Sequence, residues 1–373
     1  MKRVVTGMLL FVFAGGIALA HVGNHPSVHD TVAGIVMRMQ RNLPAEELTG
    51  ITVPEVLDFL SEEERDVLAT QHLIFNVNVP VVLHLYRQKA QEEVVYWLKD
   101  RDFEKTPLEV SVDGERFEVW RKEFDAGEIG LGVNSLSGNG DHYFISLAPQ
   151  DAGDTVEITN IYPGLHTLGT MQLDERAYIS WDDRTLTALP AELEGEVLLR
   201  GDPNKRRTAR LIDVYRITPY PATARPDHVV LTWSDDPKTT QAIQWRTSTE
   251  TNEGAVRYRL KGSGEEWTTV AADSEMLVNY NTVNDPLCLR HTVNLTGLSP
   301  DSAYEYCVGD DTENGWLKAE TFETAPSGVA PFKFIYMGDA QNGLDAWGTL
   351  VHKAYDEEPD AAFYIMAGDL VNR

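Results

Sequence analysis

Positive charge is scarce in this chain of 373 residues. Lysine and arginine together number 32 against 58 aspartate and glutamate residues, which gives a formal net charge of −26. A chain this acidic repels a phosphate backbone, and no basic stripe interrupts it, so we expect neither nucleic acid nor an anionic membrane surface as a partner. The length itself allows two or three domains, each with a core of its own.

Long apolar runs are missing beyond the first twenty residues. Residues 1–20 combine Lys2 and Arg3 with an apolar stretch and the small-residue sequence Ala18-Leu19-Ala20, which is typical of a secretory signal peptide. The mature chain is therefore expected to begin at His21, to be secreted or periplasmic, and to contain no membrane span. An uncleaved membrane anchor is the alternative, although the apolar stretch is shorter than the ~20 residues that a span requires.

Cysteine is almost absent, since only Cys288 and Cys307 occur. An export signal implies an oxidising compartment, so this pair predicts one disulfide. A metal site with two cysteine ligands is the alternative. That site is disfavoured because the CxxC spacing is lacking and His291 is the only histidine nearby in the sequence.

Several common catalytic motifs are absent as well. The chain has no glycine-rich phosphate-binding loop, no Gly-x-Ser-x-Gly nucleophile elbow and no zinc-binding helix motif. Internal repeats and low-complexity tracts are lacking too. The sequence therefore gives no motif-based support for a nucleotide-binding protein, a serine hydrolase of the elbow type or a helix-based zinc protease.

The residues that are present predict a multidomain protein that starts with two regions of unknown role. Residues 21–105 are expected to be a mainly helical, mixed α/β region, with capping boxes that begin at Thr52 and Ser61 and one strand near residues 75–79. Residues 106–217 change to an alternating apolar pattern broken by Gly, Asp and Asn, which predicts an all-β region.

Residues 218–327 are predicted to form a β-sandwich. A proline-rich linker opens the segment, and short strands with turn signals between them follow. Trp245 fits the buried core tryptophan of such sandwiches, and Leu298-Ser299-Pro300 followed by Tyr304 fits their tyrosine corner. In strand order and signature residues the segment resembles a fibronectin type III domain.

Two similar motifs lie in residues 330–373. One apolar run leads into Gly338-Asp339-Ala340-Gln341, and a second leads into Gly368-Asp369-Leu370-Val371-Asn372-Arg373. The apolar residues between the motifs recur at helical spacing, so the segment predicts a strand-helix-strand unit with buried, parallel strands. Ligands bind at the carboxyl ends of such strands, where Asp339 and Asp369 are expected to lie side by side.

This pair of carboxylates suits a pair of metal ions. Without cations the two groups would repel each other and lose hydration. One carboxylate can bind a single ion while the other bridges two ions, and a water shared by the ions becomes a nucleophile for attack on phosphorus. The alternative is that Asp339 and Asp369 only cap the turns after their strands.

With a fibronectin-like domain directly ahead of them, the two motifs resemble the first two motifs of the metallophosphoesterase superfamily, and the arrangement is similar to purple acid phosphatases. The resemblance covers about residues 225–373 and implies that residues 330–373 begin an α/β metallophosphoesterase sandwich. It further implies two metal ions, such as Fe, Zn or Mn, with Asp339 as the ligand of one ion and Asp369 as the bridging ligand. Gln341 is a candidate weak oxygen ligand, with no ligand role as the alternative.

Some positions differ from the purple enzymes. Asn372 stands where those enzymes carry a metal-bound tyrosine, so the colour of an iron–tyrosinate complex is not expected. Gln341 replaces a glycine of their first motif. Arg373 matches a phosphate-binding arginine of the related protein serine/threonine phosphatases and is expected to bind substrate; an ordinary solvated arginine is the alternative. Asn372 is a second candidate substrate-binding residue.

The resemblance implies a secreted phosphoesterase that hydrolyses phosphate monoesters through a metal-bound hydroxide. The later motifs of the family, which supply histidine ligands, are not found after Arg373, so the chain as written is expected to be an inactive fragment. A phosphodiesterase is one alternative. Another is an extracellular adhesion or carbohydrate-binding protein whose β-domains carry the function. The sequence gives no indication of the oligomeric state.

Overall fold

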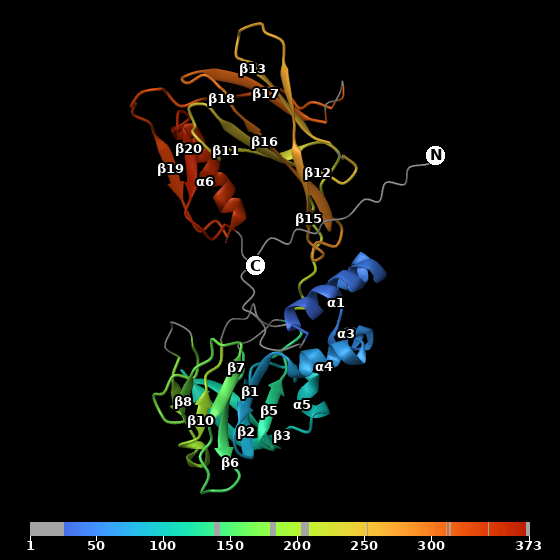
Figure 1. Cartoon of the computed structure of the whole chain (residues 1–373), viewed down its shortest axis with the longest axis vertical. Coiled ribbons are helices and arrows are strands. Elements are labelled where there is room, and N and C mark those ends of the chain that lie inside the picture. The colour runs from blue at the N-terminus through green and yellow to red at the C-terminus, as the bar shows by residue number, and fades with distance from the viewer. Residues whose placement is uncertain are drawn as a thin grey trace, which may run out of the picture. The chain divides into compact units, whose positions relative to one another are not determined.

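A computed structural model of the chain describes residues 26–137, 142–179, 184–202, 209–251, 253–310, 312, 315–341 and 343–370 (Figure 1). The chain divides into two compact units. Unit 1 comprises Met1–Pro221 with Val278–Pro286, and unit 2 comprises Ala222–Leu277 with Leu287–Arg373. The predicted signal peptide lies outside the described residues. Among the residues that are described, no helix is long and apolar enough to cross a membrane.

Unit 1 begins with short helices. They are α1 (Val28–Asn42), α2 (Ala45–Thr49), α3 (Val53–Phe59), α4 (Glu62–Thr70) and, further along the chain, α5 (Tyr96–Asp100). Both predicted capping boxes are confirmed, since carboxylate oxygens of Glu55 and Glu64 each accept a hydrogen bond of 2.9 Å from the backbone N–H of Thr52 and Ser61, respectively. The apolar sides of α1 to α4 pack into one cluster around Ile35.

Two antiparallel sheets complete unit 1. A seven-stranded sheet has the order β8-β10-β6-β2-β4-β3-β9, and a three-stranded sheet has the order β5-β1-β7. The elements are β1 (Leu73–Val77), β2 (Val81–Gln88), β3 (Glu104–Val112), β4 (Glu115–Phe124), β5 (Gly127–Leu131), β6 (Phe144–Pro149), β7 (Ile158–Tyr162), β8 (Leu168–Thr170), β9 (Leu186–Ala188), the short 3-10 helix η1 (Ala191–Leu193) and β10 (Val197–Leu199).

The predicted boundary between residues 105 and 106 does not separate two domains. β2 lies inside the seven-stranded sheet, where Leu85 pairs with Trp120 of β4 on one side and with Ile145 of β6 on the other. β1 likewise pairs with both β5 and β7. The boundary was misplaced because strand pairing joins segments distant in sequence, whereas the change from helical to alternating pattern is local.

Unit 2 begins with two four-stranded sheets. One has the order β11-β12-β16-β15 and the other β14-β13-β17-β18. Their strands are β11 (Asp227–Thr232), β12 (Gln241–Ser248), β13 (Ala255–Leu260), β14 (Thr268–Ala271), β15 (Asp273–Val278), β16 (Leu287–Leu295), β17 (Ala303–Gly309) and β18 (Glu320–Glu323). The unit boundary between Pro221 and Ala222 lies within the proline-rich linker predicted from the sequence.

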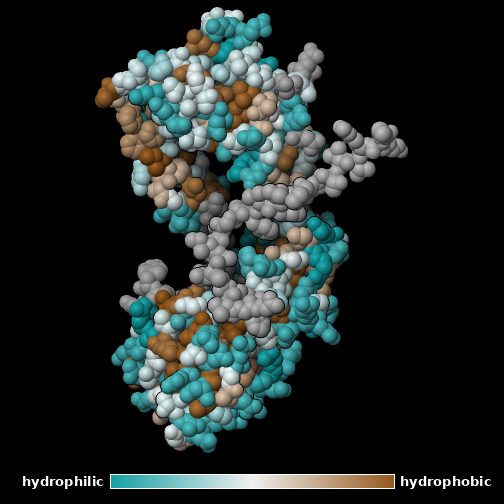
Figure 2. Space-filling view, viewed as in Figure 1, coloured by the Kyte–Doolittle hydropathy of each residue, from teal (hydrophilic) through white to brown (hydrophobic). Residues whose placement is uncertain are grey.

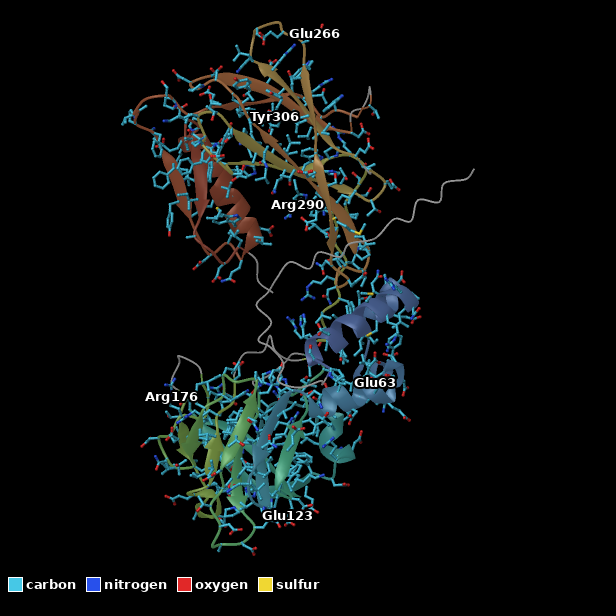
Figure 3. The ribbon with its side chains drawn as sticks, viewed as in Figure 1. Glu63, Glu123, Arg176, Glu266, Arg290 and Tyr306 are labelled. Atoms are coloured by element: carbon cyan, nitrogen blue, oxygen red, sulfur yellow. The ribbon has the colours of Figure 1, made fainter. Side chains whose placement is uncertain are left out.

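The predicted core of the sandwich is confirmed. Trp245 is 1% exposed and packs in one apolar cluster with residues of both sheets, including Val256 and Tyr306. The Tyr304 hydroxyl accepts a hydrogen bond of 2.8 Å from the backbone N–H of Ser299, as expected for a tyrosine corner. Figure 3 locates Tyr306 within the sandwich.

The predicted disulfide is not formed between Cys288 and Cys307, both of which the structure describes. Side chains alternate along a strand, so Val293 in the core implies that Cys288 faces away from the core on β16, as the exposed Arg290 does. On β17 of the other sheet, Tyr306 faces the core, and its buried neighbour Cys307 lies on the opposite face of the strand. Side chains on the outer faces of opposite sheets cannot form a disulfide or share a metal ion.

The predicted strand-helix-strand unit is present near the end of the chain. β19 (Phe334–Met337) and β20 (Phe363–Met366) are parallel neighbours joined through α6 (Leu344–Glu357). Their predicted burial is wrong: Tyr336 is 68% exposed, and none of the residues of α6 is buried. Two strands and one helix leave most of their apolar side chains uncovered, and Figure 2 shows apolar atoms on the surface of this segment.

Candidate metal centre at the ends of β19 and β20

The register of β19 and β20 brings the two Gly-Asp turns together. Met337 pairs with Met366 at the carboxyl ends of the strands. Beyond this pair, the backbone N–H of Asp339 donates to the carbonyl of Gly368 at 3.4 Å, and the N–H of Gln341 donates to the carbonyl of Asp369 at 2.9 Å. The turns that carry Asp339 and Asp369 are therefore directly hydrogen-bonded to each other.

Both aspartates adopt a left-handed backbone conformation, with φ of 59° at Asp339 and 42° at Asp369. Asp and Asn tolerate this region better than other residues that carry a Cβ. Left-handed aspartates also occur at ordinary turns of this chain, for example Asp113. The conformation alone therefore marks no site; the distinguishing feature is that two such turns lie on adjacent parallel strands.

The alternative role, turn capping, is found at a different Gly-Asp pair. The Oδ1 atom of Asp310 accepts hydrogen bonds from the backbone N–H of Thr312 at 3.0 Å and from its hydroxyl at 2.7 Å. The hydroxyl, followed by the N–H, lowers the pKa of Asp310. Within the described residues, the side chain of Asp339 makes no comparable hydrogen bond, so its carboxylate remains available to a ligand.

Gln341 contacts the second carboxylate. Its side-chain Nε2 donates to Oδ2 of Asp369 at 2.8 Å, across the gap between the two turns. Gln341 is half-buried, whereas Asp339 and Asp369 are exposed. The sequence could not reveal this hydrogen bond, because it depends on the register of two strands about thirty residues apart.

The donor atoms suit hard metal ions. Two carboxylates and an amide offer only oxygen ligands, which Mg²⁺, Mn²⁺ and Fe³⁺ accept readily. Among the described residues, no group of three or more His, Cys, Asp or Glu side chains converges. Asp339 and Asp369 thus fit a metal ion chemically, and they supply part of a site that needs further ligands.

The predicted substrate-binding residues, Asn372 and Arg373, lie outside the described residues. Their contacts with phosphate therefore stay a prediction.

A buried polar cluster in unit 1 was not expected from the sequence. His84 Nδ1 lies 3.0 Å from Oε2 of Glu196, the hydroxyl of Ser146 donates to the same carboxylate, and the hydroxyl of Tyr86 lies 2.7 Å from Ser146. Although serine, histidine and glutamate meet here, Ser146 contacts the carboxylate and not the imidazole. The cluster lacks the serine–histidine contact of a hydrolase triad and satisfies polar groups inside the seven-stranded sheet.

Three histidines line a small pocket of about 20 Å³ in the same unit. The rings of His72 and His142 stack with centroids 4.7 Å apart, and Nδ1 of His166 donates to the carbonyl of Arg200 at 2.8 Å. Among the described residues, these three histidines do not converge closely enough to hold a metal ion.

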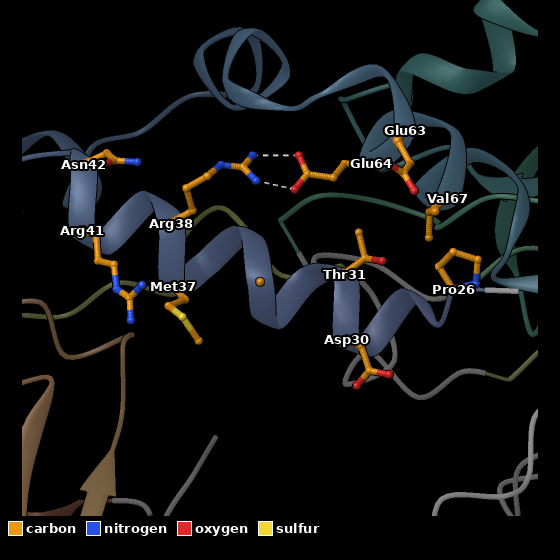
Figure 4. Close-up of a pocket in the computed structure, with 11 residues that line it drawn as sticks. Pro26, Asp30, Thr31, Met37, Arg38, Arg41, Asn42, Glu63, Glu64 and Val67 are labelled. Atoms are coloured by element: carbon orange, nitrogen blue, oxygen red, sulfur yellow. Dashed lines mark hydrogen bonds and ion pairs between the residues drawn. The ribbon is translucent and has the colours of Figure 1, made fainter. Parts of the chain in front are cut away.

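A larger, open pocket of about 560 Å³ lies beside α1 and α4 (Figure 4). Arg38 on α1 forms two hydrogen bonds with Glu64 on α4, at 2.5 and 2.7 Å. This pairing largely neutralises both charges, and the lining includes no cysteine, histidine or serine. Its acidic side chains, Asp30, Glu63 and Glu64, are of a type that can act as a general base, but the pocket offers no serine or cysteine nucleophile beside them.

Several solved structures match parts of this chain at low sequence identity. The purple acid phosphatase PPD1 from yellow lupin (Lupinus luteus) seeds is 11% identical, with a TM-score of 0.31, and the match covers 80% of this chain and 52% of that one. PhoD is 14% identical with a TM-score of 0.26, over 41% of this chain and 28% of that one. The FN5 domain of Drosophila Lar is 20% identical with a TM-score of 0.19, over 29% of this chain and 100% of that domain.

The chain spans about half the length of the lupin protein. Among curated protein sequences, none matches it. One family model matches, and it covers residues 226–324. It confirms the predicted resemblance for the β-sandwich, because residues 226–324 match the model of the purple acid phosphatase N-terminal domain.

Proposed function

We propose that this protein is a metal-dependent phosphoesterase of the purple acid phosphatase type. The observation that carries the proposal is the hydrogen-bonded pair of turns that holds Asp339 and Asp369 at the carboxyl ends of two parallel strands. A purple acid phosphatase N-terminal domain at residues 226–324 directly precedes this pair, which supports the same family for residues 330–373.

In this proposal the side chains at the strand ends bind the metal ions and hold them in position. Asp339, whose side chain has no hydrogen-bond partner among the described residues, would hold one ion, and Asp369 would lie between two. Bound ions supply Lewis acidity and an activated water for attack on a phosphate monoester. The exposure of both carboxylates lets an ester reach the strand ends from solvent.

The described residues would not complete catalysis by themselves. Two carboxylates leave most positions around a pair of ions unfilled, and a proton donor for the leaving group is also required. We therefore propose that the described residues bind metal weakly and do not turn over phosphate esters by themselves. The predicted signal peptide at residues 1–20 supports secretion or export to a periplasm.

Metal titration of the purified chain tests the site. We expect Mn²⁺, followed by isothermal calorimetry or electron paramagnetic resonance, to bind, and Asp339→Asn or Asp369→Asn to weaken binding by about tenfold or more, which is at least ~1.4 kcal/mol. Asp310→Asn is the matched control, because Asp310 also follows a glycine but caps its own turn.

Equal affinities in the wild type and in both aspartate variants would contradict the proposed site. Hydrolysis of p-nitrophenyl phosphate and of its bis-ester should stay at the background rate in this chain. A metal-dependent rate that Asp339→Asn abolishes would disprove the expected inactivity while supporting the phosphoesterase assignment.

A further inference from the structure

Gln341 is attached to Asp369 by two hydrogen bonds of different kinds. The backbone N–H of Gln341 donates to the Asp369 carbonyl at 2.9 Å, and its side-chain Nε2 donates to Oδ2 of the carboxylate at 2.8 Å. The reversed amide would place two acceptor oxygens at this distance, which an ionised carboxylate disfavours. The amide oxygen of Gln341 therefore faces away from Oδ2.

The first of these bonds aligns the turns and the second fixes the carboxylate. A carboxylate on an exposed turn can rotate about its Cβ–Cγ bond, and a ligand must be held in one orientation to bind an ion well. With Oδ2 engaged by the amide, Oδ1 is the oxygen of Asp369 that remains without a partner among the described residues.

Resting on the phosphoesterase function proposed above, we propose that Gln341 is a positioning residue that presents Oδ1 of Asp369 to the cations, and that it is not itself a metal ligand. This replaces the sequence-based assignment of Gln341 as a weak oxygen ligand. For the amide oxygen to bind an ion beside Oδ2, the amide would have to turn over and give up its hydrogen bond to Asp369.

The two roles differ in what happens to the amide when metal binds. A positioning residue keeps its N–H hydrogen bond in the metal-bound protein, whereas a ligand loses it and polarises its carbonyl carbon. Selective labelling of glutamine side chains with ¹⁵N and ¹³C makes both observable by NMR, and Gln341→Met, which keeps the length of the side chain but removes its polar atoms, assigns the signals.

We expect one Gln341 amide proton to resonate downfield in the metal-free protein and to stay there when diamagnetic La³⁺ is added to saturation. The carbonyl carbon should move little. A large shift of the carbonyl carbon together with loss of the downfield proton would overturn the proposal, because it would show coordination through the amide oxygen.

The affinity for Mn²⁺ gives a second, independent test of the role of Gln341. Loss of an orienting partner lowers metal affinity, so Gln341→Met should bind Mn²⁺ more weakly than the wild type but more tightly than Asp369→Asn, which removes the ligand itself. An equal loss in both variants would favour a ligand role and contradict the proposal.

The outcomes also separate this inference from the function on which it rests. If Asp339→Asn and Asp369→Asn bind Mn²⁺ as the wild type does, the metal site is wrong even when the downfield amide proton is observed. If those variants lose binding while Gln341 shows no hydrogen-bonded proton before La³⁺ is added, the site stands and the positioning role fails. Asp310→Asn should match the wild type in every measurement.

Discussion

The β-sandwich and the β19–α6–β20 segment lie in the same unit and are packed very differently. In the sandwich, Trp245 is 1% exposed and side chains of both sheets enclose it. In the segment, Phe334 is 47% and Tyr336 68% exposed, and none of the residues of α6 is buried. One part has a closed apolar core, and the other presents an open apolar surface.

The comparison shows that two aspartates can be aligned without the closed core that stabilises the sandwich. Four parallel residue pairs and the hydrogen bonds between the turns are enough to bring Asp339 and Asp369 together. They are not enough to bury a core, because a small parallel sheet needs cover on both faces. The candidate metal centre is thus organised by local register, while the neighbouring sandwich owes its stability to enclosed side chains.

The largest expected effect comes from removing an aromatic side chain from the sandwich and, for contrast, one from the segment. Trp245→Ala should lower the free energy of unfolding of the sandwich by about 3–5 kcal/mol, because it leaves a large cavity in a closed core. Phe334→Ala should cost less than about 1 kcal/mol, because much of its ring is already in contact with water. Hydrogen exchange of peptides from β12 and β20, read by mass spectrometry, measures each part separately.

An equal loss in both variants would remove the contrast, since it would mean that the β19–α6–β20 segment has a core whose loss is as costly as that of the sandwich. Hydrogen exchange of the β2 peptide in unit 1 should be the same in the wild type and in both variants, so it serves as an internal reference for each sample.

A buried histidine is expected to make the stability of the sandwich depend on pH. His291 is fully buried, stacks on Trp245 with ring centroids 5.3 Å apart, and lies 2.7 Å from the hydroxyls of both Thr247 and Ser274. Burial lowers the pKa of His291 below its ordinary value of 6.5. The unfolded chain therefore takes up the proton at a higher pH than the folded protein does.

The sandwich should accordingly be most stable above pH 6.5 and lose stability as the pH falls below that value. One proton accounts for at most about 1.4 kcal/mol per pH unit. Denaturant unfolding at several pH values measures the slope, which His291→Gln should reduce. His352→Gln, a change at an exposed histidine of α6, is the control and should leave the slope unchanged; a slope that persists in His291→Gln would assign it to other groups.

Much of the sandwich could be predicted because its signals are local. Trp245 marks a core strand, Tyr304 and Ser299 form their hydrogen bond within six residues of chain, and the capping boxes at Thr52 and Ser61 each lie within one helical turn. The adjacency of the Asp339 and Asp369 turns could be inferred too, because a strand-helix-strand unit leaves few ways to pair its strands.

The remaining features depend on pairings between distant segments. The cysteine pair suggested a disulfide from number and compartment, but the alternation along β16 and β17 directs Cys288 and Cys307 to opposite outer faces. β2 was not recognised as an interior strand because His84 and Arg87 interrupt its apolar pattern. Both side chains are buried, where His84 contacts Glu196 and Arg87 forms an ion pair with Glu118, each from a segment distant in sequence. No local pattern reveals such partners.

The smallest expected effect concerns the contact that links the sandwich to the β19–α6–β20 segment. Trp233, just after β11, meets Phe363 of β20 edge-on with centroids 5.3 Å apart, and Phe363 stacks on Phe334 at 5.4 Å. An aromatic pair of this kind contributes about 0.5–1.5 kcal/mol beyond its buried area, and less where the ring is partly exposed, as Trp233 is at 40%.

Trp233→Ala should therefore speed hydrogen exchange in β20 by a few-fold and leave β12 unchanged, because the sandwich core does not include this ring. Trp267→Ala is the matched control: Trp267 is also partly exposed, but it stacks against Arg257 and Arg259 on the outer face of β13. If Trp233→Ala left β20 exchange at the wild-type rate, the strands that align Asp339 and Asp369 would hold their register without help from the sandwich, and the two parts would be independent in stability as well as in packing.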